Sequence, residues 1–336
     1  MTENRRIILK SRPAGLPTPE NFALESVPMP VVGEGEMLVR TLWMSVDPYI
    51  RGRISDRKSY APPFQIGEPL DGYFVGRVEE SKSGRFPAGT HVFGTGGGWR
   101  DYHATDGKAL RSVDPNIAPL QAYIGVLGMP GQTAYVGLLD IGLPQTGETV
   151  FVSAASGAVG AVVCQIAKLK GCRVIGSAGS DEKCAWLRDE AGVDAVINYK
   201  VCGDLEAALA AACPDGVDVY FDNVGGAHLQ AALSQMNFFG RIVACGMIAG
   251  YNDNAPRPGP NNLFLIVGRR LSIQGFIVSD HGARTDDFLA DVSGWIREDK
   301  IRWRETIAEG LEAAPGAFIG LFHGDNFGKM CVKVAE

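Results

Sequence analysis

A turn of small residues separates an apolar strand from a helix near the middle of the chain. Residues 149–152 read Thr-Val-Phe-Val, residues 154–160 read Ala-Ala-Ser-Gly-Ala-Val-Gly, and helical spacing of apolar residues follows over 158–169. The turn is Ala-x-x-Gly-x-x-Gly, a variant of Gly-x-Gly-x-x-Gly with Ala154 in the first place. A strand, such a turn and a helix in this order predict the first βα unit of a doubly wound sheet.

Strands and helices alternate after this turn. Five further β-favouring segments are expected at 173–176, 195–198, 217–222, 241–245 and 272–278. Helices are expected between or after them at 181–190 (with Ser180 as N-cap), 204–212, 227–236 and 286–298. Six strands with intervening helices predict an α/β fold with a Rossmann doubly wound parallel sheet.

The small residues of the turn let a ligand approach the backbone closely. The helix that follows offers unpaired N–H groups and the positive end of its dipole, which suits a pyrophosphate. Tight packing between strand and helix also favours small residues, and that alternative needs no ligand. The alternation downstream favours a dinucleotide site, with candidate residues Ala154, Ala155, Ser156, Gly157 and Gly160.

The end of the second expected strand bears on the choice between NAD and NADP. NAD sites usually present a carboxylate there, which binds the ribose 2′-hydroxyl. Residues 176–179 read Gly-Ser-Ala-Gly without an acid, and Asp181 and Glu182 fall in the first helical turn, where they complement the dipole. Lys183 can neutralise a 2′-phosphate, although an exposed helix lysine is the alternative. NADP is therefore the favoured cofactor.

The first 125 or so residues lack this alternation. Short β-favouring segments at 37–43, 72–78 and 91–93 are separated by prolines and glycines, without a useful helical period. The tail from 301 holds strand-like, helix-like and strand-like segments in turn. We expect a β-rich catalytic domain over 1–127 and 301–336, and a Rossmann NADP-binding domain over 128–300.

The composition excludes several classes of function. The net charge is −6 without a sustained basic run, which disfavours nucleic-acid and anionic-membrane partners. The longest uncharged run, 149–167, is broken by Ser, Ala and Gly and is weak as a membrane span. Seven cysteines without a CxxC pair disfavour a disulfide framework. We expect a soluble, cytoplasmic protein.

A β-rich domain followed by a Rossmann domain resembles the medium-chain dehydrogenase/reductase superfamily, whose first domain is GroES-like. Zinc-dependent members carry a catalytic Cys and a Gly-His-Glu motif in that domain. Here Asp71-Gly72-Tyr73 stands at the position of the motif, and residues 1–127 contain no cysteine. Catalytic zinc needs about three protein ligands, and only His91 and His103 precede residue 228. We therefore expect no metal and a hydride transfer without a Lewis acid.

Several collinear motifs resemble a narrower group within this superfamily. They read DPYIRGR at 47–53, GMPGQTAY at 128–135, AASGAVG at 154–160, GSDEK at 179–183, NYK at 198–200, FDNVGG at 221–226, CG at 245–246 with YN at 251–252, and GDNFGK at 324–329. Nearly the whole chain resembles the zinc-free leukotriene hydroxydehydrogenase, prostaglandin reductase and 2-alkenal reductase family. The resemblance implies NADPH-dependent reduction of the C=C bond of α,β-unsaturated aldehydes and ketones by a cytoplasmic homodimer.

The resemblance assigns roles to individual cofactor-binding residues. Lys183 and Tyr199 fall where the family holds the 2′-phosphate. Asn223 follows the fourth strand, at the sheet edge where ligands bind. The segment Cys245, Gly246, Met247, Ile248 is expected beside the nicotinamide ribose, and Phe276, Ile277, Val278 at the nicotinamide. The family role of Asn326 implies that the tail folds back to the cofactor, whereas a plain turn residue is the alternative.

Two tyrosines are candidates for the reaction itself. Tyr251 matches the family's active-site tyrosine and is expected to stabilise an enolate or donate a proton, against the alternative of a loop tyrosine. Tyr49 is expected to line the substrate pocket. The segment 248–251 and the proline loop 254–260 depart from the family and leave the identity of the enone open.

Two other functions stay open at this point. One is an NADPH quinone oxidoreductase, since the zinc-free superfamily includes such enzymes. The other is a non-catalytic NADPH-binding protein, although Tyr251 and Asn326 favour an enzyme.

Overall fold

The chain forms two compact units in the computed structural model, which describes residues 3–255 and 258–336. Met1–Gly128 and Glu305–Glu336 make up the first, here called the β-rich unit. Met129–Arg304 makes up the second, here called the Rossmann unit. Pro256 and Arg257, in the expected proline loop, lie outside the described residues.

The described part of the Rossmann unit contains a parallel sheet of six strands in the order β10-β9-β8-β11-β12-β13. The strands are β8 (Thr149–Val152), β9 (Arg173–Ala178), β10 (Ala195–Asn198), β11 (Val217–Asp222), β12 (Met236–Ala244) and β13 (Ser272–Gly275). The first strand lies in the middle, so the chain winds outward in both directions. This order confirms the predicted doubly wound sheet.

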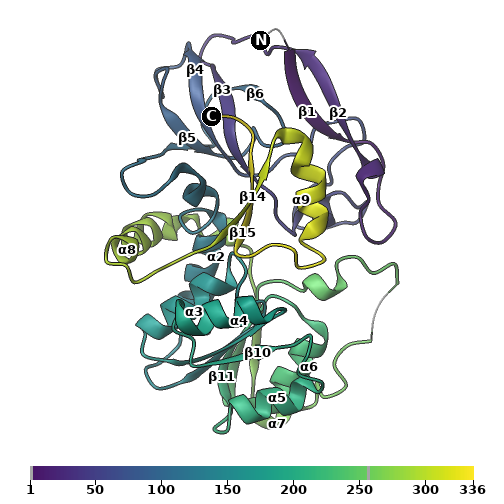
Figure 1. The fold of residues 1–336 in the computed structure, drawn as a ribbon, viewed down its shortest axis with the longest axis vertical. Coiled ribbons are helices and arrows are strands. Elements are labelled where there is room, and N and C mark those ends of the chain that lie inside the picture. Colours follow the sequence, from purple (N-terminus) through teal and green to yellow (C-terminus); the bar gives the residue numbers. More distant parts are fainter. Residues whose placement is uncertain (1–2, 256–257) are drawn as a thin grey trace. The chain divides into compact units, whose positions relative to one another are not determined.

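Helices connect these strands and pack against the sheet (Figure 1). They are α2 (Met129–Val136), α3 (Gly160–Leu169), α4 (Asp181–Asp189), α5 (Leu205–Ala212), α6 (Gly226–Gln235), α7 (Leu265–Arg269) and α8 (Thr285–Arg297). Ser180 caps α4 as predicted, because its Oγ accepts a hydrogen bond from the backbone N–H of Lys183 at 3.3 Å. Asp204 caps α5 in the same way through two backbone N–H groups.

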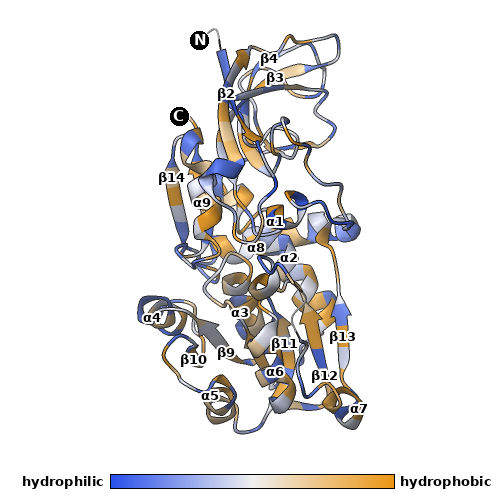
Figure 2. Ribbon diagram, turned by 90° about the vertical axis from the view of Figure 1, so that its right-hand side faces the viewer, coloured by the Kyte–Doolittle hydropathy of each residue, from blue (hydrophilic) through white to orange (hydrophobic). Residues whose placement is uncertain are grey.

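The central strands are apolar because both faces of the sheet are covered. Every residue of β8 is buried, and the Phe151 ring stacks on Tyr220 of β11 with ring centroids 5.0 Å apart. Hydrophobic residues also dominate β12 (Figure 2). The edge strand β13 differs, since all four of its residues are exposed.

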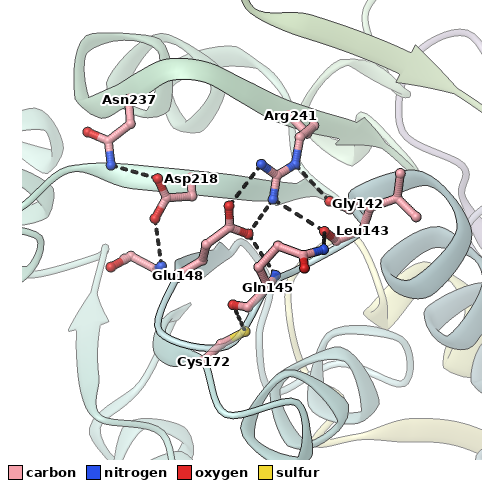
Figure 3. A network of polar contacts seen from close by, with 9 residues as sticks. Gly142, Leu143, Gln145, Glu148, Cys172, Asp218, Asn237 and Arg241 are labelled. Atoms are coloured by element: carbon pink, nitrogen blue, oxygen red, sulfur yellow. Dashed lines mark hydrogen bonds and ion pairs between the residues drawn. The ribbon is translucent and has the colours of Figure 1, made fainter.

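A polar network fixes the amino-terminal ends of the central strands (Figure 3). Arg241 of β12 pairs with Glu148, which precedes β8, and its Nε donates to the carbonyl of Gly142 at 2.9 Å. Asp218 of β11 accepts 2.8 Å hydrogen bonds from the backbone N–H of Thr149 and from Asn237 Nδ2. These contacts set the register of β8, β11 and β12 at the end opposite their carboxyl ends.

The β-rich unit is built on a sheet of order β14-β15-β3-β4-β5-β7 in the described residues, with β6 on β3 and a separate β1–β2 hairpin. Its strands are β1 (Glu3–Leu9), β2 (Phe22–Pro28), β3 (Met37–Ser45), β4 (Phe74–Ser81), β5 (His91–Gly94), β6 (Tyr102–Thr105), β7 (Leu110–Ser112), β14 (Glu305–Glu309) and β15 (Lys329–Lys333). The short helices are α1 (Ile50–Arg53) and α9 (Ala314–Gly320). Figure 1 shows the yellow carboxyl-terminal strands joining the strands of this unit.

The core of this unit joins distant parts of the chain. Trp99 is fully buried and packs against Phe22 of β2 and Phe318 of α9, with ring centroids 6.2 and 6.3 Å away. Phe318 lies more than 200 residues downstream of both Phe22 and Trp99. Burial of these large rings therefore ties the tail to the amino-terminal strands.

Some boundaries differ from those expected. The strand expected over 272–278 ends at Gly275, and the tail strand is β14, Glu305–Glu309, rather than 302–306. The sequence did not indicate β1, β2, β6 or β7, and α1 is a single helical turn that no sequence period marks. Among the described residues, none of the helices has the length and hydropathy needed to cross a bilayer.

Candidate cofactor and active site

The carboxyl ends of β8 and β11 meet at the point where the winding of the sheet reverses. Ser153 follows β8 and binds the start of the turn after β11 in two ways. Its Oγ accepts from the backbone N–H of Asn223 at 2.9 Å, and its carbonyl accepts from Asn223 Nδ2 at 2.8 Å. Ligands of doubly wound sheets bind at this switch point. The sequence indicated Asn223 but not Ser153, whose role depends on a contact 70 residues along the chain.

A buried carboxylate organises the same turn. Asp222 Oδ1 accepts hydrogen bonds from the hydroxyl of Tyr220 at 2.7 Å and from the backbone N–H groups of Val224 and Gly225 at 2.9 and 2.7 Å. Its Oδ2 is buried and has no protein partner in the described structure. Burial raises the pKa of Asp222, and the hydrogen bonds act against that rise. The buried Asp222 carboxylate thus holds Val224 and Gly225, the two residues that lead into α6.

The small-residue turn after β8 leaves no room for larger side chains. Ala154 has a positive φ of 49°. A Cβ on Gly160 would lie 2.4 Å from the Ala154 carbonyl oxygen, and one on Gly157 would lie 3.2 Å from it. No side chain caps the amino end of α3. A backbone cradle that ends at a helix N-terminus of the switch point fits the pyrophosphate of a dinucleotide.

The ends of β9 and β10 form a second part of this edge. Lys183 lies half-buried in the first turn of α4. The Tyr199 hydroxyl would lie 2.8 Å from a Cβ on Gly179, so this ring covers the turn between β9 and α4. Beneath it, the buried His228 meets the Tyr199 ring edge to face at 5.1 Å. Lys183 and Tyr199 thus lie just beyond the carboxyl ends of the neighbouring strands β9 and β10. The sequence did not indicate His228.

The segment after β12 returns to the carboxylate turn. The backbone N–H groups of Cys245 and Gly246 each donate to the Asp222 carbonyl at 3.0 Å. Met247 donates its N–H to the Tyr251 hydroxyl at 3.3 Å, and that hydroxyl would lie 3.1 Å from a Cβ on Gly246. Burial, with Asp222 nearby, raises the pKa of the Cys245 thiol to about 12. Tyr251 therefore folds over the turn that the sequence indicated, and Cys245 stays a neutral thiol.

Phe276, Ile277 and Val278 follow the edge strand β13 and are half-buried. Phe276 Cζ would lie 2.7 Å from a Cβ on Gly137, and Phe221 of β11 crowds the same position. A glycine is therefore required at 137 for the Phe276 ring to pack there. This packing fixes the segment that the family resemblance assigns to the nicotinamide.

Tyr49 and Asn326 belong to the β-rich unit. Tyr49 lies between β3 and α1, and burial together with the charge of Asp47 raises its pKa well above the usual value. The same two causes raise the pKa of Tyr73, which lies just before β4. Asn326 Nδ2 donates to the Gly328 carbonyl at 2.8 Å in the loop between α9 and β15. The sequence indicated Tyr73 only as a residue at the position of the zinc motif.

The position of the zinc motif holds other contacts. Both oxygens of Asp71 accept from the backbone N–H of Gly96, at 3.0 and 3.2 Å. His103 is buried beneath Gly97, and neither ring nitrogen has a protein partner in the described structure. Over residues 3–255 and 258–336, no three His, Cys, Asp or Glu side chains gather in a group able to hold a metal ion.

The chain combines a β-rich unit with a Rossmann unit, and the switch point of the Rossmann sheet is a backbone cradle. This combination is typical of two-domain oxidoreductases that use a dinucleotide cofactor. Sequence profiles agree. Residues 5–113 match the N-terminal domain of oxidoreductase, and residues 158–293 match the profile described as zinc-binding dehydrogenase.

Relatives that match over nearly the whole chain identify the family within this class of oxidoreductases. The NADPH-dependent curcumin reductase of Escherichia coli is 46% identical over 99% of this chain and 97% of its own. Prostaglandin reductase 1 of Rattus norvegicus is 45% identical over 99% and 100%. The crystal structure of CurA from Vibrio vulnificus in complex with NADPH matches with a TM-score of 0.94 and 45% identity over 99% of each chain. The chain belongs to the zinc-free medium-chain reductase family of prostaglandin reductases and 2-alkenal reductases.

Proposed function

We propose that the protein reduces the C=C bond of α,β-unsaturated ketones and aldehydes with NADPH. The observation that carries this proposal is the similarity over the whole chain to NADPH-dependent reductases, at 45–46% identity. The backbone cradle at the switch point of the sheet supports it. In this proposal the Rossmann unit binds the cofactor and supplies Tyr251, and the β-rich unit supplies Tyr49.

The cofactor-binding residues divide by the part of NADPH that they would contact. The turn residues Ala154, Ala155, Ser156, Gly157 and Gly160 hold the pyrophosphate, and Lys183 with Tyr199 holds the 2′-phosphate. Asn223 and the segment 245–248 contact the nicotinamide ribose. Asn223 donates its Nδ2 to the Ser153 carbonyl, so its Oδ1 is left as an acceptor for a ribose hydroxyl. Residues 276–278 and Asn326 complete the site.

NADPH, when bound, supplies the hydride that reduces the β-carbon of the enone. Negative charge then develops on the carbonyl oxygen of the substrate and requires hydrogen-bond donors. Tyr251 is our assignment for this stabilisation or for proton donation. A phenol is protonated at neutral pH, and burial with the Asp47 charge raises the pKa of Tyr49 further, so its hydroxyl is suited to donate a hydrogen bond to the substrate. No metal-assigned step is needed, and Asp71 and Tyr73 stand where zinc enzymes carry ligands.

A homodimer in the cytoplasm completes the proposal. In the described chain, β12 is the only strand that pairs with β13. Ile273 on that strand and Val267 and Phe264 nearby are 41, 81 and 71% exposed. An open edge with apolar neighbours suits pairing with a second copy. We expect sedimentation as a dimer and a shift towards monomer in Ile273→Lys. The free cysteines fit a reducing compartment.

A panel of substrates tests the function. We would follow NADPH consumption by chelator-treated protein with a short enone, a long-chain enal, a quinone and a simple alkanal, and identify the products. Saturated carbonyl products without alkanal turnover are expected. Turnover of the quinone alone would replace the proposal by a quinone oxidoreductase, and tight NADPH binding without turnover of any compound would favour a binding protein.

A further inference from the structure

A lysine and an aspartate form a buried ion pair in the β-rich unit. Lys329, the first residue of β15, is 3% exposed and Asp47 is 4% exposed. Lys329 Nζ donates to Asp47 Oδ1 at 2.9 Å and to the backbone carbonyl of Val46 at 2.9 Å. Its stem packs on Gly125, where a Cβ would lie 3.4 Å from Lys329 Cγ. The Lys329 side chain is thus fixed by two acceptors at its ammonium group and by packing along its stem.

The second oxygen of the carboxylate is also bound. The Ser45 hydroxyl donates to Asp47 Oδ2. The end of β3 is therefore held by three contacts, two from Lys329 and one from Ser45. The turn that follows continues from this anchor, because the backbone N–H of Ile50 donates to the Asp47 carbonyl at 3.1 Å. Tyr49 lies within that turn.

Stability alone does not account for a pair of this kind. Removing two charges from water costs several kcal/mol per ion, and apolar residues of the same size often serve as well in a core. The position of the pair suggests another role. Burial raises the pKa of both Tyr49 and Tyr73, and the Asp47 charge raises each further. The pair therefore lies close to Tyr49, the tyrosine of this unit that the proposed function assigns to the substrate site.

We propose that Lys329 and Asp47 are positioning residues, which fix the turn of Tyr49 so that its hydroxyl meets the substrate carbonyl. The proposal rests on the proposed function only through the assignment of Tyr49 to the substrate site. Misplacement of a catalytic group by about 1 Å can lower the rate by up to about 100-fold. Loss of the pair thus reduces turnover even in a protein that folds fully.

The first test separates positioning from folding. Lys329→Met leaves a buried carboxylate unpaired and lowers the melting temperature. The double variant Asp47→Asn with Lys329→Met removes both charges and regains most of that temperature. We expect its kcat/KM for an enone to remain about tenfold or more below wild type, with NADPH affinity within about twofold. Recovery of both melting temperature and kcat/KM would overturn the proposal.

A milder variant decides the question should the double variant not fold. Ser45→Ala removes one contact to Asp47 and keeps the ion pair. Thr41→Val is its control, because Thr41 lies on the same strand, is fully buried and loses one bond, to the Gly97 carbonyl. We expect kcat to fall about three- to tenfold in Ser45→Ala alone. Equal kcat values in the two variants would contradict positioning.

A readout without substrate keeps this test apart from the proposed function. The ring resonance of Tyr49 in tyrosine-labelled protein can be assigned by its loss in Tyr49→Phe. We expect this resonance to shift or broaden in Ser45→Ala but not in Thr41→Val, whether or not enones are reduced. An unchanged resonance in Ser45→Ala would overturn positioning, whereas a shifted resonance without enone turnover in wild type would overturn the function alone.

Discussion

The hydroxyl of Tyr220 donates a 2.7 Å hydrogen bond to Oδ1 of Asp222, two residues further along the same buried strand. Residues two apart on a strand share a face, so the phenol reaches the carboxylate without bending the backbone. The same oxygen accepts the backbone N–H groups of the turn that leads into α6. Tyr220 thereby helps, from within the core, to hold the turn between β11 and α6 at the proposed cofactor site.

Tyr220→Phe removes this donor and keeps the ring stack on Phe151. A buried carboxylate that loses one donor costs about 1–3 kcal/mol. We expect a lower melting temperature and weaker NADPH binding in a fluorescence titration. Glu148→Gln is the control, because it disturbs the Arg241 pair at the opposite end of the sheet. It should lower stability and leave NADPH affinity unchanged, and weaker NADPH binding in both variants would contradict a local role of Tyr220.

Lys183→Gln tests the selection of NADPH over NADH. A hydrogen bond to a charged group contributes about 1.5–3 kcal/mol, so we expect NADPH affinity to fall about tenfold or more. NADH has no 2′-phosphate, and its affinity should stay the same. Lys168→Gln is the matched control. Lys168 lies in the last turn of α3, at the end remote from the cofactor turn, and pairs with Asp194. An equal loss for both cofactors in Lys183→Gln would reject the 2′-phosphate assignment.

The ring contact between His228 and Tyr199 predicts an indirect effect on the cofactor. Such contacts contribute about 0.5–1.5 kcal/mol, so His228→Ala should weaken NADPH binding about two- to tenfold. His228→Phe retains an aromatic ring against Tyr199 and should bind NADPH nearly as wild type does. Isothermal titration of both variants checks this. Weak binding by the Phe variant alone would show that the contact has no such role.

Two buried histidines predict acid sensitivity. Burial lowers the pKa of His103 to about 3 and that of His228 to about 4. In the unfolded chain an imidazole binds its proton near pH 6.5, so unfolding takes up protons between these values. Stability is then full above about pH 6.5 and falls on acidification, by up to about 1.4 kcal/mol per pH unit for each histidine.

His103→Leu tests this dependence. Denaturant unfolding between pH 6.5 and 4.5 should show a shallower loss of stability than wild type, because one of the two protons is no longer taken up. The exposed His323 provides the control variant His323→Gln, which should keep the wild-type slope. An unaltered slope in His103→Leu would show that His103 takes up no proton on unfolding, and would contradict a lowered pKa in the folded protein.

The sequence predicted the Rossmann unit well because its signals are local. Most strands and helices there have their own apolar period, and Ser180 marks a helix start by its side chain alone. The exceptions are α2 and α7, which the sequence did not indicate. The β-rich unit was predicted only in part. The strands β1 and β2 pair along their full length with charged residues on both, for example Arg6 opposite Glu25, so their alternation is weak. Short strands such as β7 carry too few residues for a period.

The contacts that shape the candidate site were not predictable for a different reason. Asp47 and Lys329 are 282 residues apart, and Ser153 and Asn223 are 70 apart. Their side chains meet only because strand order brings β3 beside β15 and β8 beside β11. A single sequence holds no signal for such pairs. It indicated Asn223 and Tyr49 through their motifs but not the residues that hold them.

The most direct measurement of C=C reduction uses NADPH that carries deuterium on the transferable position of its nicotinamide. Chelator-treated protein would be given this cofactor and an enone, and the product would be examined by mass spectrometry and NMR. The expected product is the saturated ketone with one deuterium on the carbon that was β to the carbonyl. Deuterium on the carbonyl carbon of an allylic alcohol would contradict conjugate reduction by this protein.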